Sequence, residues 1–585
     1  MIIFLLAFGY FLSLPFTAKY EMNSLLGESF FGDRAELIEE TYPELFSKTY
    51  GNKAGFLNAL NEASAAATDG ARARFGFSEA DVNQIVSSNA GQPFDLEGTA
   101  GAFEAAGKNE QATKMREWMG WFDGQTFDEA HLAPQVQEKA DQINAGIQGL
   151  SLSGAEKFNI TKAASVSMAS SNGWLVFFLT FIVGSIGALM HILPKNAELP
   201  GIKHNNIWFD SLNSRGAIGI MLGTFLIAFY CVMYWWPAWV AEWALLTDPV
   251  SSIMTGSASG SQWFLYGLIY TFAVVVMGIR YLIKYRHSRY QQIRTFSVMF
   301  FQVAIAFVLA NLLELNGLPN TDLKNIWPLD YSLFFDYRIG KLVSEGTIGY
   351  WMLGWGIFLF LIGVPLFTYL YGKRWYCSWV CGCGGLAETA GDPFRQQSDK
   401  SLKAWKIERW SIHGVMVFAI FMTILVAYTT YWDVFRDSGG QHLLGSGLDS
   451  YKVRQWYGFG VSSIFAGVVG TGFYPLMGNR VWCRFGCPLA AYLGIVQRFK
   501  SRFRITTNGG QCISCGNCST YCEQGIDVRW YAQRGQNIVR SSCVGCGVCS
   551  AVCPRGVLSL ENGPDEARTE IQAIHIGRDE VKILS

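Results

Sequence analysis

The cysteines near the end of the chain repeat one spacing, C-x2-C-x2-C-x3-C. The first copy comprises Cys512, Cys515, Cys518 and Cys522, and the second comprises Cys543, Cys546, Cys549 and Cys553, with Pro554 next. In such runs three closely spaced thiolates wrap one [4Fe-4S] cluster, while the fourth reaches the other cluster. The spacing therefore predicts two clusters, one on Cys512, Cys515, Cys518 and Cys553 and the other on Cys543, Cys546, Cys549 and Cys522.

Structural zinc is the main alternative for paired C-x2-C motifs. Zinc requires neither the doubled x3 spacing nor the Cys-Pro ending, so iron-sulfur clusters are favoured. Disulfides are disfavoured, because clusters need reduced thiols and a reducing compartment. Gly516, Gly545 and Gly547 let the backbone curl closely around the sulfurs, where a Cβ would crowd.

Two shorter motifs have the spacing C-x3-C and contain Cys377 with Cys381, and Cys483 with Cys487. Each follows an apolar segment and a basic residue, which indicates an internal duplication. Residues i and i+4 share one face of a helix, so we expect each motif to present two thiols on one side. The four thiols, with Cys383 as a further candidate, predict a third cluster or a metal site. A redox-active thiol pair and unliganded buried cysteines are the alternatives.

The composition indicates how these cysteines are carried. The 585 residues are 50% hydrophobic, 15% aromatic and only 16% charged, which is typical of a membrane protein. The net charge of zero gives no sign of a nucleic-acid partner. Eight apolar segments are long enough to span a bilayer, namely residues 2–18, 174–194, 216–237, 263–283, 296–313, 350–371, 411–431 and 457–477.

The predicted fold class is a mostly α polytopic membrane protein with about eight transmembrane helices. A small carboxy-terminal α+β domain of the two-cluster bacterial ferredoxin type follows them. The predicted parts are a hydrophobic anchor (1–18), an extracytoplasmic helical domain (19–173), transmembrane helices without an assigned motif (174–349), a transmembrane core with both C-x3-C motifs (350–500), the ferredoxin domain (501–563) and a charged tail (564–585).

Loop charges predict the orientation. Lys and Arg crowd the loops after the fourth and sixth segments, and the positive-inside rule places these loops in the cytoplasm. Both termini and the ferredoxin domain then lie on the cytoplasmic side of a bacterial inner membrane. Residues 19–173 lie on the opposite, extracytoplasmic side. A basic collar of Arg484, Lys500, Arg502 and Arg504 is expected to anchor the ferredoxin domain to anionic lipid.

The outer stretch 19–173 has 12 Lys and Arg against 22 Asp and Glu, no cysteine and one histidine, His131. Haem attachment through C-x-x-C-H is therefore not predicted there, and a docking or spacer role is favoured. The chain also lacks a phosphate-binding glycine loop, a dinucleotide fingerprint and a nucleophile triad, which indicates an electron-transfer component rather than a stand-alone enzyme.

The two C-x3-C motifs and the double cluster domain together resemble the NosR/NapH family of membrane polyferredoxins, to which the CcoG/RdxA/FixG proteins are related. The resemblance covers roughly residues 350–563. Cys483-x3-Cys487-Pro488 matches the family's C-x3-C-P motif, whereas Gly382 replaces that proline after Cys381 and Cys383 is extra.

The resemblance implies electron transfer at the membrane between cytoplasmic or quinol donors and a respiratory protein partner. CcoG-like members imply the alternative, copper handling or assembly of a respiratory metalloenzyme, because soft thiolates suit Cu(I). NosR-type proteins carry a covalent flavin on a threonine. The nearest strings here, at 69–72 and 153–156, lack that threonine, so no covalent flavin is predicted.

Overall fold

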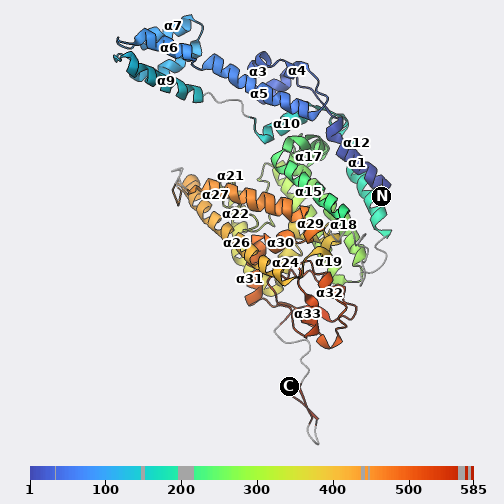
Figure 1. Cartoon of the computed structure of the whole chain (residues 1–585). Coiled ribbons are helices and arrows are strands. Elements are labelled where there is room, and N and C mark those ends of the chain that lie inside the picture. Colours follow the sequence, from blue (N-terminus) through green and yellow to red (C-terminus); the bar gives the residue numbers. More distant parts are fainter. Residues whose placement is uncertain are drawn as a thin grey trace. The chain divides into compact units, whose positions relative to one another are not determined.

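The computed structural model describes residues 1–32, 35–146, 152–194, 216–436, 442–445, 448–563, 573–576 and 581–584. Residues 195–215 of the predicted 174–349 part, and most of the predicted tail 564–585, lie outside this range. The chain is mostly helical (Figure 1). It divides into two compact units. One comprises residues 1–11, 174–235 and 246–585, and the other comprises residues 12–173 and 236–245.

The unit built from 12–173 and 236–245 is helical. Its elements are β1 (Lys19–Tyr20), α2 (Ser24–Phe31), α3 (Ala35–Thr41), α4 (Glu44–Ser47), α5 (Lys53–Phe75), α6 (Glu79–Asn89), α7 (Leu96–Ala105), α8 (Asn109–Met119), η2 (Gly120–Phe122), α9 (Glu129–Gly146), α10 (Gly154–Ala164), β2 (Ser165–Val166), α11 (Met168–Ser171), η5 (Pro237–Val240) and α16 (Ala241–Leu245). Two apolar cores form, one within residues 77–143 and the other joining residues 18–67 to α10. Ser78 and Asp81 form a capping box that starts α6.

Residues 236–245 are held to this unit by a buried polar cluster. Lys53, which is 2% exposed, pairs with Glu242 and donates a hydrogen bond to the carbonyl of Trp239 at 2.8 Å. The Tyr20 hydroxyl donates to Glu242 Oε1 at 2.7 Å. Lys and Glu are rarely buried unless they are paired, so this pair fixes the register of the segment against α5.

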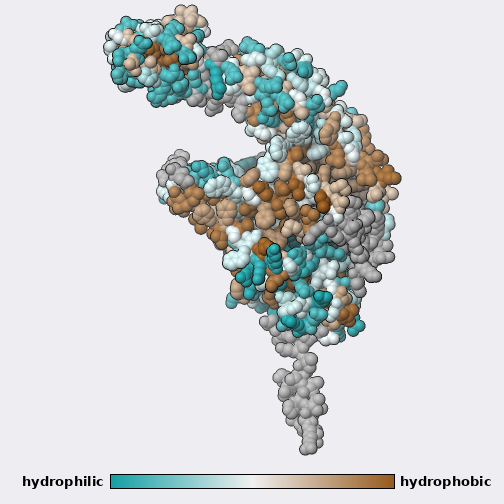
Figure 2. Space-filling model, in the orientation of Figure 1, coloured by the Kyte–Doolittle hydropathy of each residue, from teal (hydrophilic) through white to brown (hydrophobic). Residues whose placement is uncertain are grey.

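The other unit contains most residues of the apolar helical runs, and α1 (Ile2–Thr17) continues from residue 12 into the unit described above. The runs are α1, α12 to α13 (Gly173–Phe177, Phe178–Val183 and Gly184–Ile192), α15 (Ala217–Trp235), α18 (Gln262–Lys284), α19 to α20 (Arg289–Phe300, Phe301–Leu309 and Ala310–Leu315), α22 to α23 (Thr347–Phe358, Leu359–Gly363 and Val364–Tyr371), α26 (Leu402–Thr430) with η9 (Tyr431–Phe435), and α27 to α28 (Ser450–Trp456, Tyr457–Val469 and Gly470–Gly472). The middle piece of each three-part run, and η9, is π-helical. Figure 2 shows hydrophobic side chains gathered over the middle of this unit and hydrophilic ones over its ferredoxin-like end.

Five helices in the described residues are long and apolar enough to cross a membrane. They are Gly173–Ile192, Gln262–Lys284, Arg289–Leu315, Thr347–Tyr371 and Leu402–Phe435, and a sixth span results if Gly219–Trp235 and Pro237–Leu245 are one broken span. Of the remaining predicted segments, 2–18 folds as a shorter apolar helix of 16 residues, and 457–477 is not among the long apolar helices. The structure therefore supports a multi-span membrane protein, and the count of eight stays a prediction.

Short helices lie between these spans or follow them. They are α17 (Asp248–Thr255), α21 (Asp336–Ser344), α24 (Arg374–Cys377), α25 (Gly382–Glu388), η8 (Asp392–Gln397), α29 (Tyr474–Met477), α30 (Val481–Phe485) and α31 (Pro488–Lys500). The ferredoxin-like part pairs β3 (Phe503–Thr507) antiparallel with β4 (Leu558–Asn562), with Phe503 opposite Asn562. Between these strands lie η12 (Gly509–Gln511), α32 (Asn517–Thr520), α33 (Val528–Gln533) and α34 (Val548–Ala551). In the tail, β5 (Ala573–Ile576) pairs with β6 (Val581–Leu584).

Candidate metal centres

The two long cysteine runs fold around two separate hollows. The lining residues of the first include Cys512, Cys515, Cys518 and Cys553, and those of the second include Cys522, Cys543, Cys546 and Cys549. Each hollow takes three cysteines from one run and the fourth from the other. This is the crossed grouping that the C-x2-C-x2-C-x3-C spacing predicts.

Left-handed backbone turns shape the loops around both hollows. Positive φ angles occur at Ser514 (58°), Gly516 (82°), Gly545 (61°) and Gly547 (73°). At Gly545 the constraint is also steric, because a Cβ there would lie 2.6 Å from the Cβ of Arg374. A Cβ on Gly547 would likewise lie 2.8 Å from a ring carbon of Tyr290. Glycine is therefore required at both positions, where the loop meets the membrane-spanning part. The sequence predicts that these glycines let the backbone wrap the sulfurs, but it does not predict these steric contacts.

The two hollows differ in their access to solvent. Cys515 in the first is exposed, and its neighbour Ile513 is 55% exposed. In the second, Cys543 and Cys549 are buried. The first hollow therefore lies at the surface of the ferredoxin-like part, and the second lies inside the protein.

The chemistry of the second hollow fits a bound cationic centre. Burial raises the pKa of the Cys546 thiol to about 12 and that of Cys543 to about 11. Without a metal these thiols would stay protonated at neutral pH, whereas binding of iron makes them thiolates. Within the described residues, no three His, Cys, Asp or Glu side chains converge to hold one metal ion.

The C-x3-C motifs lie at breaks between helices, which corrects the expectation of a shared helix face. Cys377 ends α24, and Cys381 is the residue before α25. Cys483 lies in α30, and Cys487 is the residue before α31, where its Sγ accepts a hydrogen bond from the Ala490 amide. α24 ends at Cys377 and α30 ends at Phe485, before the second cysteine of each motif, so i and i+4 do not belong to one continuous helix.

The same backbone hydrogen bonds recur in the two motifs. The amides of Val380 and Cys381 both donate to the carbonyl of Tyr376, at 3.0 and 2.8 Å. The amides of Gly486 and Cys487 both donate to the carbonyl of Trp482, at 2.9 Å each. The internal duplication read from the sequence is therefore present as a repeated turn.

The structure brings the four C-x3-C cysteines into one buried apolar group of side chains, which we call the C-x3-C cluster. Cys377, Cys381, Cys483 and Cys487 are each 5–6% exposed within it, and Cys383 packs against its edge. A hydrogen bond from the Cys383 thiol lowers the pKa of Cys381 to about 6, despite burial. Cys383 therefore acts on a neighbouring thiol.

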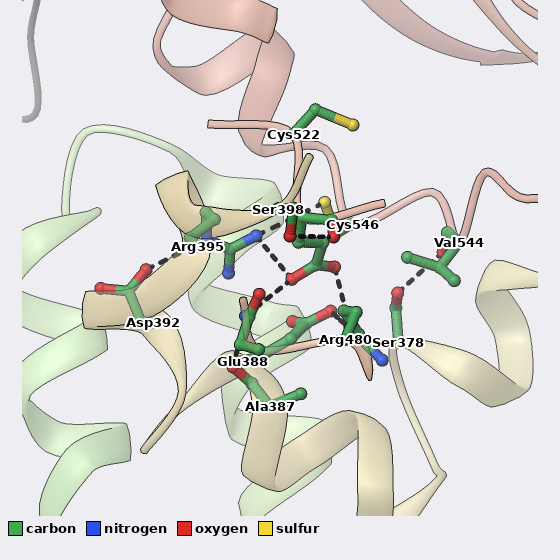
Figure 3. A network of polar contacts seen from close by, with 12 residues as sticks. Ser378, Ala387, Glu388, Asp392, Arg395, Ser398, Arg480, Cys522, Val544 and Cys546 are labelled. Atoms are coloured by element: carbon green, nitrogen blue, oxygen red, sulfur yellow. Dashed lines mark hydrogen bonds and ion pairs between the residues drawn. The ribbon is translucent and has the colours of Figure 1, made fainter. Parts of the chain in front are cut away.

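A network of buried charges lies beside Cys546 of the second hollow (Figure 3). We call this set the charge network; its members are Arg280, Lys284, Arg294, Glu388, Asp392, Arg395, Arg480 and Glu523, each at most 2% exposed. Asp392 accepts from Arg280 at 2.7 Å and Lys284 at 2.8 Å. Glu388 pairs with both Arg294 and Arg480. Every carboxylate in the network thus faces more than one cation.

Glu523 connects the two cysteine sites through this network. It pairs with Arg395 at 2.7 Å and with Arg480 at 3.1 Å. Arg395 Nη1 also lies 3.9 Å from Cys546 Sγ, and Arg480 Nη1 lies 3.7 Å from Cys483 Sγ. Although burial alone raises it, the pKa of Glu523 lies below its usual value because Arg395 and Arg480 outweigh that effect.

Hydrogen bonds to backbone carbonyls fix the loop that carries the second cysteine run. Lys373 Nζ donates to the carbonyl of Ser541 at 3.1 Å, Ser378 Oγ to Val544 at 2.7 Å, and Gln497 Nε2 to Cys543 at 2.9 Å. Ser378 follows Cys377 directly, so the hydroxyl next to one C-x3-C cysteine holds the loop of the second hollow.

The charge network was missed from the sequence, because its cations were assigned to exposed loops. The basic collar is also partly wrong. Arg484 is buried and pairs with Glu408 at 2.7 Å, and Arg504 is buried and donates to the carbonyl of Gly563 at 3.0 Å. Of that set, Lys500 and Arg502 are exposed.

Comparison with known proteins supports the iron-sulfur interpretation. The family described as a 4Fe-4S binding domain matches residues 353–401 and again 457–506, one match around each C-x3-C motif. The family described as a 4Fe-4S dicluster domain matches residues 504–554. The chain therefore carries 4Fe-4S ferredoxin-type domains.

Two curated relatives are similar to part of the chain. YccM of Escherichia coli (strain K12), whose name provisionally describes an electron transport protein, is 27% identical over 27% of this chain and 43% of its own length. The methylamine utilization ferredoxin-type protein MauN of Methylobacillus flagellatus is 26% identical over 27% of this chain and 51% of its own length. The chain thus spans about half the length of these relatives. No solved structure matches it significantly.

Proposed function

We propose that this protein is a membrane-bound iron-sulfur electron-transfer protein. The two hollows would each hold a [4Fe-4S] cluster, on Cys512, Cys515, Cys518 and Cys553 and on Cys522, Cys543, Cys546 and Cys549. When bound, such clusters supply one-electron chemistry at potentials that depend on charge, hydrogen bonding and burial. The names of YccM and MauN support the same class of function.

The observation that carries the proposal is the direct connection between the cysteine sites. Glu523 contacts Arg395 beside Cys546 and Arg480 beside Cys483. These cations lie next to sulfurs that become anionic on metal binding, so they stabilise thiolates at both ends. The exposed Cys515 side offers contact with a soluble protein partner, and the buried sites lead from there to the membrane part.

We further propose that the C-x3-C cluster of Cys377, Cys381, Cys483 and Cys487 holds a third [4Fe-4S] cluster. The two matches to the 4Fe-4S binding domain each include one of these pairs. Cys383, which lies at the position equivalent to Leu489 in the other motif, would remain a neighbour that donates to Cys381.

A cavity of about 380 Å³ beside this site would accept the quinol that the resemblance implies. Its wall includes Cys383 and Cys483, and Tyr270 and Gln302 contribute polar groups from the spans. Lys324, paired with Asp322 at 2.6 Å, also lines it. This pair lies in the segment between α20 and α21, and it would supply ionisable groups for the protons that quinol oxidation releases.

The proposed location is a bacterial inner membrane, with the ferredoxin-like part in the cytoplasm and residues 19–173 on the opposite side. The support is the positive-inside rule. It rests on the basic side chains that stay exposed outside the charge network, which include Arg286, Arg289, Lys403, Lys406 and Arg409.

The test is the content of iron, copper and acid-labile sulfide in protein purified without oxygen, together with redox-titrated EPR. Three clusters predict about twelve irons per chain, and Cys483→Ser with Cys487→Ser should lower this to about eight while one EPR signal disappears. Eight irons in the unmodified protein would refute the third cluster. Copper that is lost in the double variant would instead support metal handling, and zinc in place of iron would refute the proposed function.

A further inference from the structure

A second cavity, of about 350 Å³, opens beside the C-x3-C cluster where α26 begins. Helices α26 and α31 form two of its walls, and residues of the ferredoxin-like part form the third. Cys483 and Lys373 lie in its lining, but none of the functions proposed above uses it. We call it the interfacial pocket.

The interfacial pocket is basic and aromatic. Arg409 of α26 and Arg498 of α31 are exposed at its rim, and the contacts described for them are with aromatic rings, Trp405 and Trp410 for Arg409 and Phe499 for Arg498. Within the described residues, neither guanidinium pairs with a carboxylate. The acidic residue of the lining, Glu408, pairs with Arg484. The pocket therefore has positive charge available for an anion.

The interior of the interfacial pocket contains a polar group that no described protein atom satisfies. Gln524 is 2% exposed, and both its amide oxygen and its amide nitrogen lack a hydrogen-bond partner in the described protein. A buried amide without partners costs free energy, so its presence points to a ligand that both accepts and donates hydrogen bonds. The same side chain lines the second hollow.

The interfacial pocket lies at headgroup depth. The helix Leu402–Phe435 has 34 residues, so at about 1.5 Å per residue it is well over 10 Å longer than a hydrocarbon core of about 30 Å. Its first eight residues include Lys403, Lys406, Glu408 and Arg409, and the apolar run follows them, so we expect the first turns, with Arg409 and Trp410, to extend into the interface. Trp410 is 75% exposed and Phe499 is 72% exposed, as is usual for aromatic side chains at a membrane surface.

We propose that the interfacial pocket binds one anionic phospholipid. Arg409 and Arg498 would hold the phosphodiester, because guanidinium groups bind phosphate oxygens in a bidentate manner. A hydroxylated headgroup, as in phosphatidylglycerol, would reach Gln524, and the acyl chains would lie along the exposed aromatic side chains. Basic pockets between transmembrane helices bind anionic headgroups in this way. The lipid would contact the membrane helices and the ferredoxin-like part at once.

The test compares a double variant, Arg409→Gln combined with Arg498→Gln, with a matched double control variant. Lys406→Gln with Lys500→Gln removes the same charge from the same two helices at exposed residues outside the pocket lining. The full-length protein, reconstituted in nanodiscs with phosphatidylglycerol and phosphatidylcholine and then extracted, is analysed by native mass spectrometry. We expect one phosphatidylglycerol per chain in the unmodified protein and in the control, and affinity lower by about thirty-fold in the arginine variant.

Several results would overturn this inference. Equal retention of phosphatidylglycerol by the arginine variant would do so, as would equal loss in the lysine control, which indicates a general charge effect. Equal retention of phosphatidylcholine would indicate non-specific annular lipid. Displacement of the lipid by millimolar inorganic phosphate would indicate a phosphate site instead. Iron content is measured in each sample to show that the variants are folded.

Discussion

Replacing Glu523 with glutamine tests whether the charge network holds the ferredoxin-like part in place. The carboxylate is 1% exposed and faces Arg395 at 2.7 Å and Arg480 at 3.1 Å. Glutamine keeps the shape but leaves both guanidinium groups with less compensating charge. Removing one partner of a buried ion pair costs about 3–5 kcal/mol.

The lower end of this range applies, because the amide oxygen still accepts one hydrogen bond. Each 1.4 kcal/mol is a factor of ten, so the ratio of docked to undocked states should fall at least about 100-fold. Hydrogen exchange with mass spectrometry measures this ratio on the loop at 541–549, whose carbonyls accept from Lys373, Ser378 and Gln497. Its amides should exchange about 100 times faster in Glu523→Gln.

Glu561→Gln is the control, since this carboxylate lies on β4 of the same part and outside the charge network. This half-buried carboxylate contacts neither Arg395 nor Arg480 among the described ion pairs, so its replacement should change exchange of the loop by less than a few-fold. If Glu523→Gln leaves the loop as protected as the control does, the network does not hold the loop, and the reasoning is refuted. In samples that contain iron, loss of the negative charge should also raise the reduction potential of the nearest cluster.

Three further outcomes are expected. Lys53→Met should lower the melting temperature of the helices around Trp239, because Glu242 is left buried without its cation, at a cost of about 3–5 kcal/mol. Adding Glu242→Leu should restore most of the lost stability. Tryptophan fluorescence during heating measures both variants, and a double variant that melts lower still would contradict the prediction. Burial raises the pKa of Asp81, but hydrogen bonds from Lys108 and Ser78 outweigh it and hold that pKa below 3.8. The stability from Asp81 is therefore complete above about pH 4 and is lost as the pH falls through the lower folded pKa, so acid melts of Asp81→Asn should show a weaker pH dependence than the parent over that interval. Chelation of iron should speed amide exchange around both cysteine hollows while exchange in α5 stays constant, and equal exchange with and without iron would argue against metal in the hollows.

The cysteine spacing was sufficient to predict which residues line each hollow. Ligand runs such as Cys512–Cys522 are local, so the identity and spacing of a few residues determine the loop that they form. The crossed grouping with Cys553 follows from the same rule. Helical spans could be predicted for a similar reason, because length and hydropathy are properties of one segment.

The charge network could not be predicted in this way. Its pairs join residues far apart in the chain, for example Arg395 with Glu523 and Arg280 with Asp392. In the sequence Arg280 and Arg395 look like the basic loop residues of the positive-inside rule, and only tertiary packing shows that they are buried. The prediction of a shared helix face in the C-x3-C motifs was wrong for a different reason. The i and i+4 rule assumes a continuous helix, whereas each motif turns before its second cysteine.

The repeated turn has a consequence for how the C-x3-C cluster is assembled. Each half of the repeat contributes two of the four thiols, so a chain with a single half could complete the set only by joining a second copy of itself. Such a symmetric pair would form and dissociate with protein concentration. With both halves in one polypeptide, assembly becomes intramolecular, and each half is free to change separately. Gly382 and Cys383 of one half occupy the positions that Pro488 and Leu489 occupy in the other. In a symmetric pair of identical chains, each such change would have to appear in both halves.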